Sequence, residues 1–423
     1  MNQFQKIILV VFCLSEILLF SVYRNIFGEF ISPVILFILG LTIGVLPLIF
    51  FKKQNVENNF KYHSTKNWQT VILYTVALFG FLVTNTLCRH VFNNYAISVE
   101  ISDIIPQIQK FVERAEHLWY PYKTISFPTY DLFPTYLPLH WAPFIIADKL
   151  HFDYRYLANG VLYLSLIFLF YHIFKSHTIA FIEKIILIVL PFVGIYTFIN
   201  FDNISVGVSV EQMIMGYYIF LSTVLVTQKN IYFRSGAVLL CLLSRFSFLF
   251  WVPLFLYSIF IFEGKKQLTK AILFLTCGVL LLYIIPFVLK DPSVFLKSQA
   301  SYMAGTLGEW QRNPSPHLHN GLGLSNYFLD FLSGTNAHKI HVLQLMLISI
   351  SILTMLCLGF FLNKNKKKLD HRIFNMASLK IMLTVFYAFV QIPYSYLYLV
   401  PMGVSFVVLF ASFNKKYFNT NNS

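Results

Sequence analysis

Two carboxylates stand three residues apart at the start of a helical pattern. Glu100 and Asp103 precede a run over 103–118 in which apolar residues recur with the spacing of an amphipathic helix. An acidic side chain at such a position can take a proton from a substrate hydroxyl. Ser102 or Asp103 can equally cap the first turn of the helix. The two roles are compatible, so both stay open for Asp103.

Aromatic residues and prolines follow this helix, which we expect to lie flat on a membrane surface. Tyr120, Tyr122 and Tyr136 belong to the segment 119–141, which predicts an irregular platform that dips into the membrane. Aromatic rings offer large flat surfaces on which a sugar can stack. The same residues are common at the membrane–water interface of any membrane protein. For a single tyrosine, the interface role is the more common one.

A second polar stretch surrounds Arg312, whose guanidinium could bind two oxygens of a phosphate. Lys297, His317 and His319 could assist it, and Trp310 belongs to the same candidate binding stretch. Each could equally be an ordinary residue of a solvated loop. The two histidines alternate along the chain, but irregular loops place histidines anywhere and no cysteine supports them. We therefore predict no metal site, and a divalent cation stays open as a cofactor.

Arg245 is a charged residue inside an apolar stretch. A charge inside a membrane costs at least a few kcal/mol (about 2.5–3.5 on insertion scales), so Arg245 should pair with another group or reach the surface. It could bind a lipid phosphate, or it could hold helices together. The sequence does not separate these two roles.

The elements that position these residues must be membrane helices. Of 423 residues, 57% are hydrophobic and 12% are charged, and the mean hydropathy is +0.66. A soluble protein of this size has too little polar surface to cover that much apolar surface, which excludes a soluble enzyme. The net charge of +14 does not indicate a nucleic-acid partner, because most basic residues flank apolar stretches.

A membrane-spanning helix needs about 20 apolar residues. Such stretches run over 7–27, 31–51, 69–92, 155–175, 183–201, 211–228, 271–289, 341–362, 377–394 and 395–413. The stretch 235–262 has basic residues at both ends, so we expect Arg245, Ser247 and Pro253 to break it into a hairpin of two short helices. The sequence thus predicts a single all-α transmembrane domain over 1–423 with 11 or 12 spans, 12 being preferred.

The basic residues predict the direction of each span. Loops rich in Lys and Arg, including 52–66, 363–380 and the tail with Lys415 and Lys416, should be cytoplasmic. Both termini are then cytoplasmic, and the protein lies in the cell (inner) membrane. Two long segments, 93–154 and 290–340, fall on the extracytoplasmic side, and loops of this length usually carry function.

The residues of these loops resemble a known superfamily. An acidic pair after an early span, an amphipathic helix, Tyr120-Pro121-Tyr122 and Tyr136-Leu137-Pro138-Leu139 are similar to the first outer loop of GT-C glycosyltransferases. Among them, the bacterial members that use polyprenyl-phosphate sugars have the most similar pattern of residues in this loop. The second long loop after 291–295 and the aromatic–proline run 393–401 extend the likeness to most of the chain.

The resemblance implies a membrane glycosyltransferase of a GT-C-like fold that works on the extracytoplasmic face. It would move a sugar, with inversion, from a polyprenyl-phosphate donor to a hydroxyl of a glycan, lipid or protein acceptor. It favours Asp103 over Glu100 as the general base. Arg312, with Arg245 or Lys297, would contact the lipid phosphate. The alternatives are a flippase for a polysaccharide or lipid-linked oligosaccharide, or a polymerase.

Overall fold

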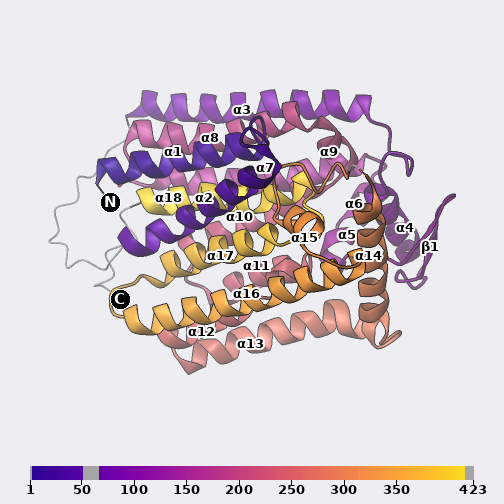
Figure 1. The fold of residues 1–423 in the computed structure, drawn as a ribbon. Helices are drawn as coiled ribbons and strands as arrows, with labels where there is room; N and C mark the ends of the chain where they lie inside the picture. The colour runs from indigo at the N-terminus through magenta and orange to yellow at the C-terminus, as the bar shows by residue number, and fades with distance from the viewer. Residues whose placement is uncertain (1, 51–65, 314, 415–423) are drawn as a thin grey trace.

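The chain forms a bundle of long helices, seen here in a computed structural model that describes residues 2–50, 66–313 and 315–414 (Figure 1). Within these residues, nine helices are long and apolar enough to cross a membrane. The chain is therefore an all-helical, multi-pass membrane protein, as expected. The nine are α1 (Gln3–Phe20), α2 (Gly28–Phe50), α3 (Asn67–Asn94), α7 (Tyr154–Lys175), α8 (Phe181–Phe201), η1 with α12 (Phe246–Glu263), α13 with η2 (Lys265–Val288), α16 (Asn336–Asn365) and η3 with α18 (Ser395–Phe413).

Three further helices pack among them: α10 (Glu211–Thr227), α11 (Ile231–Leu242) and α17 (His371–Ala388). These three do not meet the criteria of length and hydropathy that the nine meet, so the expected count of 11 or 12 spans stays a prediction. The expected span 377–394 is displaced, because α17 begins six residues earlier. Asp370 caps it by accepting a hydrogen bond from the backbone of Arg372, at 2.8 Å.

The stretch 235–262 is a hairpin, as predicted. Its first arm, α11, ends at Leu242, and its second arm, α12 (Val252–Glu263), follows a short 3-10 turn, η1 (Phe246–Phe248). The guanidinium of Arg234 binds both carboxylate oxygens of Glu263, at 2.6 and 2.5 Å. This ion pair joins the start of the first arm to the end of the second arm. Arg245 lies at the turn between the two arms.

Burial separates the centre of the bundle from its periphery. In α18, 94% of the most apolar window is buried, whereas in the segment Lys265–Val288 only 11% is buried. Because both segments are apolar, the second must present its side chains to lipid, while the first is enclosed by other helices. Helices α1, α8, α10 and α17 pack against α18 and complete the centre.

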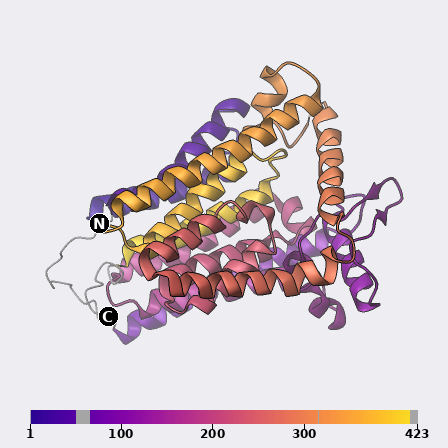
Figure 2. The same ribbon diagram turned by 90° about the horizontal axis from the view of Figure 1, so that it is seen from below.

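Both long loop segments lie at one end of the bundle, here called the loop end (Figures 1 and 2). Two hydrogen bonds join them: Ser301 accepts one from the backbone of Phe133 at 3.2 Å, and Ser298 donates one to the carbonyl of Pro134 at 2.9 Å. The helical elements there are α4 (Ile104–Glu116), α5 (Pro138–Trp141), α6 (Phe144–Lys149), α9 (Asn203–Val208), α14 (Val294–Gln311) and α15 (Ser325–Phe331). Strands β1 (Ile125–Ser126) and β2 (Asp131–Leu132) form an antiparallel pair beside them.

The start of α1 and the end of α18 lie together at the opposite end, where Lys6 stands over the ring of Phe413 at 4.9 Å. The two ends of the described chain therefore lie away from the loop end, and the side of the membrane that each faces stays a prediction. The basic loop 52–66 and the tail with Lys415 and Lys416 lie outside the described residues, except for Lys66.

The amphipathic helix α4 does not use its apolar face as expected. Ile105, Ile108, Phe111 and Val112 are buried against α5 and α6, so the face packs on the protein itself instead of on lipid. The ring of Phe111 stacks on Trp141 with centroids 5.0 Å apart. The helix ends at Glu116, and Leu118, with a φ of 57°, is exposed beyond it.

Lys380 lies inside the bundle and not in a cytoplasmic loop, which corrects the expected boundary of 363–380. Its side chain is fully buried in α17 and pairs with Glu16 of α1. It also donates a hydrogen bond to the carbonyl of Pro401 at 3.0 Å, and Ser405 donates one to Glu16 at 2.6 Å. A buried lysine is tolerated only when it is paired and hydrogen-bonded in this way.

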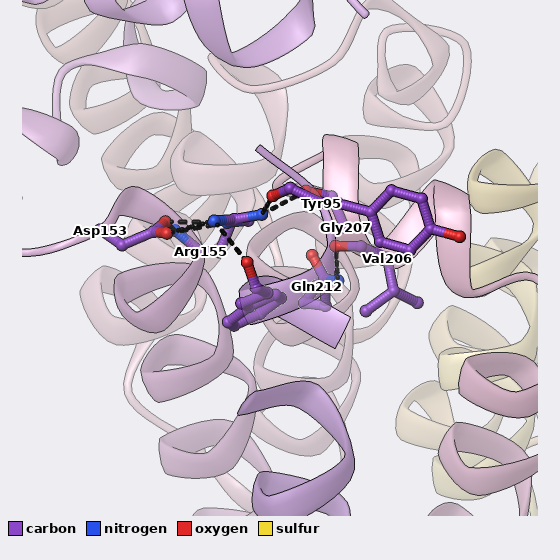
Figure 3. Close-up of polar contacts among 7 residues, drawn as sticks. Tyr95, Asp153, Arg155, Val206, Gly207 and Gln212 are labelled. Atoms are coloured by element: carbon purple, nitrogen blue, oxygen red, sulfur yellow. Dashed lines mark hydrogen bonds and ion pairs between the residues drawn. The ribbon is translucent and has the colours of Figure 1, made fainter. Parts of the chain in front are cut away.

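A second buried cation, Arg155, fixes the loop end (Figure 3). Its guanidinium pairs with Asp153 and donates to the carbonyls of Tyr95 at 2.7 Å and Gly207 at 2.8 Å. It also donates to the carbonyl of Phe92 at 3.2 Å. These contacts use all five N–H groups of the guanidinium. Arg155 therefore joins the end of α3, the start of α7 and the end of α9, and it has no donor left for a ligand.

Removing one partner of the Lys380–Glu16 pair should destabilise the fold strongly. We expect Lys380→Met to lower the free energy of unfolding by about 3–5 kcal/mol, because the carboxylate of Glu16 is left buried and unpaired. The double variant Glu16→Gln/Lys380→Met should recover most of this loss. Reversible unfolding in mixed micelles measures all three. Lys110→Met, which breaks the exposed Lys110–Glu113 pair, is the control and should cost less than about 1 kcal/mol. Equal losses for the two pairs would contradict the prediction.

Arg155→Lys should loosen the loop end. A lysine ammonium has three N–H donors instead of a planar fork of five, so at least one of the three buried carbonyls loses its donor if the bond to Asp153 is kept. We expect a loss of about 3 kcal/mol or more in the free energy of unfolding. Protease cleavage within 93–154 should also become faster. The same change at the exposed Arg89 is the control, and unchanged cleavage in Arg155→Lys would argue against this role.

Candidate functional site

The carboxylate of Asp103 is not used as a helix cap. Asp103 stands at the N-cap position of α4, but its side chain accepts no capping hydrogen bond. Instead, it accepts a hydrogen bond from the hydroxyl of Tyr130 at 3.0 Å. Burial, and then the charge of Asp103, raises the pKa of the Tyr130 hydroxyl. Tyr130 therefore stays protonated and holds the carboxylate in place.

Glu100 lies in the turn before α4 and is exposed. Its backbone N–H donates to the hydroxyl of Ser98 at 3.2 Å. Asp103 is more buried and has the tyrosine partner, so the two acids differ in setting although the sequence presents them as a pair.

Tyr136 links Asp103 to the interior. Its ring stacks on His140 of α5 with centroids 4.2 Å apart and planes 11° apart. Burial raises the pKa of Tyr136, and the charges of Asp103 and Glu211 raise it further. Burial lowers the pKa of His140, and the charge of Arg245 lowers it further. Tyr136 thus lies within electrostatic range of both Asp103 and the buried charges.

Those buried charges are Arg245 and Glu211, which form an ion pair. Glu211 is the first residue of α10, and Arg245 occupies the turn of the hairpin before η1. The side chain of Glu211 is 2% exposed and that of Arg245 is 19% exposed. The backbone N–H of Leu139 donates to the carbonyl of Leu243 at 2.9 Å, which fixes α5 against this turn.

Tyrosines from several elements complete the site. Arg245 is within electrostatic range of Tyr136, Tyr387 and Tyr396, and the hydroxyl of Tyr387 lies 3.3 Å from that of Ser247. The rings of Tyr394 and Tyr396 stack in parallel, with centroids 5.3 Å apart. Tyr302 of α14 is also within electrostatic range of Arg245 and Tyr387. Below, "central cluster" denotes Asp103, Tyr136, His140, Glu211, Arg245, Tyr302, Tyr387, Tyr394 and Tyr396.

The stretch around Arg312 contributes only in part to this cluster. His317 contacts the ring of Tyr394 with centroids 4.6 Å apart, and burial lowers its pKa. Arg312 is 65% exposed and pairs with Glu309 at 3.0 Å, beside the cluster. Trp310 is buried and donates from Nε1 to the carbonyl of Gln391 at 3.0 Å.

His319 points elsewhere and lies 3.0 Å from Glu29, at the start of α2. The two histidines are therefore not brought together by the fold. In the described part of the chain, no group of three His, Cys, Asp or Glu side chains could hold a metal ion.

Three other candidate residues have structural contacts. Tyr120 donates to the carbonyl of Phe287, and Tyr122 donates to that of Tyr136, both at 2.9 Å. Lys297 pairs with Asp291 at 2.7 Å, a hydrogen bond that lowers the pKa of the Asp291 carboxyl. It also stands 5.8 Å from the ring of Phe133, which places it at the contact between the two loop segments.

Sequence reasoning did not select Glu211, His140, Tyr302 or Tyr387 as site residues. One signal for Glu211 was available, since a charged Arg245 in an apolar stretch requires a partner and Glu211 begins a neighbouring apolar stretch. No comparable signal marks Tyr387, which lies one residue before the end of α17, inside an apolar stretch of the sequence.

The central cluster offers a carboxylate near the loop end, an ion pair deeper inside and aromatic rings between them. A carboxylate can accept a proton from a hydroxyl, and the ion pair and rings can orient a polar ligand. No protein-family model, curated protein or solved structure matches the chain. Its function must therefore be inferred from this geometry.

The low pKa of His140 predicts a pH dependence of stability. In the unfolded chain, His140 gains a proton below its ordinary pKa of 6.5, whereas the folded protein resists this protonation. Its contribution to stability is therefore complete above pH 6.5 and declines by up to about 1.4 kcal/mol per pH unit below it. We expect His140→Phe, which keeps a ring on Tyr136, to flatten the unfolding free energy between pH 7.5 and 5.5. Parallel profiles for the two proteins would contradict this.

Proposed function

We propose that the protein is an integral-membrane glycosyltransferase of the GT-C type. The observation that carries the proposal is the carboxylate of Asp103, which is free of a capping role and held by Tyr130. Its charge acts on Tyr136, as do the charges of the buried pair of Arg245 and Glu211. A proton acceptor near the end of a membrane bundle, beside aromatic rings, suits transfer to a hydroxyl. The match of this arrangement to the loops expected of such enzymes adds support.

In this proposal, Asp103 accepts the proton of the acceptor hydroxyl while that oxygen attacks the anomeric carbon of the donor sugar. The bond from the anomeric carbon to the phosphate oxygen breaks on the opposite face, and the lipid phosphate leaves with the electron pair. The sugar is transferred with inversion, as in base-activated attack by inverting glycosidases. The Tyr130 hydroxyl fixes one carboxylate oxygen and leaves the other for the acceptor.

A lipid-linked donor follows from the location of the cluster. The basic residues predict that the loop end is extracytoplasmic, and the sequence has no phosphate-binding glycine motif for a nucleotide sugar. A polyprenyl-phosphate sugar has its tail in the bilayer and its phosphate near the surface. Arg312 and Lys297 are two exposed cations of the second segment that could meet that phosphate.

The buried pair Lys380–Glu16 favours a second candidate, a lipid-linked oligosaccharide flippase, because transporters place paired charges within the membrane. Reconstituted vesicles distinguish the two functions. A chemically altered glycan supports the transferase, and movement of an unaltered lipid across the bilayer supports the flippase.

Asp103→Asn should abolish most of the transfer activity. An amide cannot accept the proton, so we expect a loss of about 10²- to 10⁴-fold in kcat with little change in the unfolding temperature. The assay is sugar transfer by the purified protein from a polyprenyl-phosphate sugar. The matched control is Glu100→Gln, which makes the same chemical change at an exposed acid and should keep most of the activity. Full activity in Asp103→Asn would remove Asp103 as the base, and loss only in Glu100→Gln would assign that role to Glu100.

A further inference from the structure

The Arg245–Glu211 pair differs from the other buried arginine–glutamate pair of the hairpin in its carboxylate, because Nε of the arginine lacks a partner in both pairs among the described residues. Arg234 binds both oxygens of Glu263, at 2.6 and 2.5 Å. Arg245 binds Oε1 of Glu211 through one terminal nitrogen, and Oε2 of Glu211 has no hydrogen-bond partner in the described part of the chain. Nε of Arg245 also lacks one there. A buried acceptor and a buried donor thus lie within one ion pair, both unsatisfied.

The chemistry of these two atoms argues against a phosphate as their ligand. A phosphate only accepts hydrogen bonds when it is ionised, so it could satisfy Nε of Arg245 but not Oε2 of Glu211. Its charge would also be repelled by the carboxylate of Glu211, which already balances Arg245. A hydroxyl both donates and accepts, so one or two neighbouring hydroxyls could satisfy both atoms without bringing a new charge.

The surroundings suit a sugar ring. Tyr136, Tyr387 and Tyr396 lie within electrostatic range of Arg245, and aromatic rings pack on the apolar face of a pyranose. Tyr136 is within electrostatic range of both the ion pair and Asp103.

We propose that Glu211 and Arg245 are the specificity residues for the transferred sugar and bind its hydroxyls, and that the lipid phosphate binds elsewhere. The inference rests on the proposed transferase function and replaces the expected contact between Arg245 and the phosphate. A site that is built to hydrogen-bond a hydroxyl rejects an analogue that lacks it, because the buried partners are left unpaired.

Binding of synthetic donors tests this without any turnover. The probes are farnesyl phosphate, a panel of farnesyl phosphoryl hexoses, and the monodeoxy analogues of the hexose that the wild type binds best. They are titrated against the full-length protein in nanodiscs. We expect Glu211→Gln to weaken binding of the best hexose by about tenfold or more and to change binding of farnesyl phosphate by less than about twofold. Equal loss for both probes would overturn the proposal.

A double-mutant cycle assigns the hydroxyl. One monodeoxy analogue should bind the wild type as weakly as the intact sugar binds Glu211→Gln, with no further loss when both changes are combined. Losses that simply add for every analogue would overturn the proposal. Glu263→Gln is the matched control, because it changes the pair in which both carboxylate oxygens bind the arginine, at the other end of the hairpin. The folded fraction of this variant should bind all probes with the affinity of the wild type.

The remaining outcomes separate this inference from the transferase. If Glu211→Gln does not fold, the monodeoxy analogues are compared on the wild type alone. A loss of affinity when one or two particular hydroxyls are missing supports the proposal. A similar loss of affinity for every analogue overturns it. The effects of Glu211→Gln and of one missing hydroxyl can be coupled in binding while no acceptor receives the sugar. That result refutes the transferase function but supports the sugar site. Transfer by the wild type with full sugar affinity in Glu211→Gln refutes the sugar site and leaves the transferase.

Discussion

The ion pair between Arg245 and Glu211 is the interaction on which the loop end depends. An unpaired arginine cannot stay inside the bundle, so the apolar stretch 235–262 must bend where Arg245 can meet an acid. The bend creates the hairpin and directs its turn toward the start of α10. The bond between the backbones of Leu139 and Leu243 then fixes α5, and with it Tyr136 and His140, above the same turn. A single electrostatic requirement thus positions residues from three parts of the chain.

The spans could be predicted because their signal is local: about 20 apolar residues suffice to cross a membrane. Their ends were less predictable, because caps decide them, as Asp370 does for α17. Lys380 shows where the rule for basic residues fails. Its acidic partner, Glu16, is 364 residues away in the sequence, and only tertiary packing brings the two together.

The site was predictable only as far as residue type carries the information. Asp103 and Arg245 stand out because a carboxylate before a surface helix and a charge in an apolar stretch are both unusual. The contacts of Tyr120 and Tyr122 with backbone carbonyls could not be foreseen, because a carbonyl acceptor has no sequence signature. The contacts of Arg155 could not be predicted for the same reason, because three of its acceptors are backbone oxygens.

The buried arginines suggest why one pair, and not another, would meet a ligand. Arg155 uses every N–H group. Arg234 binds both oxygens of Glu263, so the carboxylate of that pair is satisfied, although Nε of Arg234 has no partner in the described residues. Completing a buried pair stabilises the fold, and incomplete pairs are costly unless something else satisfies them. Arg245 and Glu211 keep one donor and one acceptor unused, in the part of the bundle where tyrosines gather. In the proposed sugar site, the free protein would bear the cost of these unpaired atoms and recover it when a hydroxyl-bearing ligand binds, so recognition of the sugar would depend on its hydroxyls.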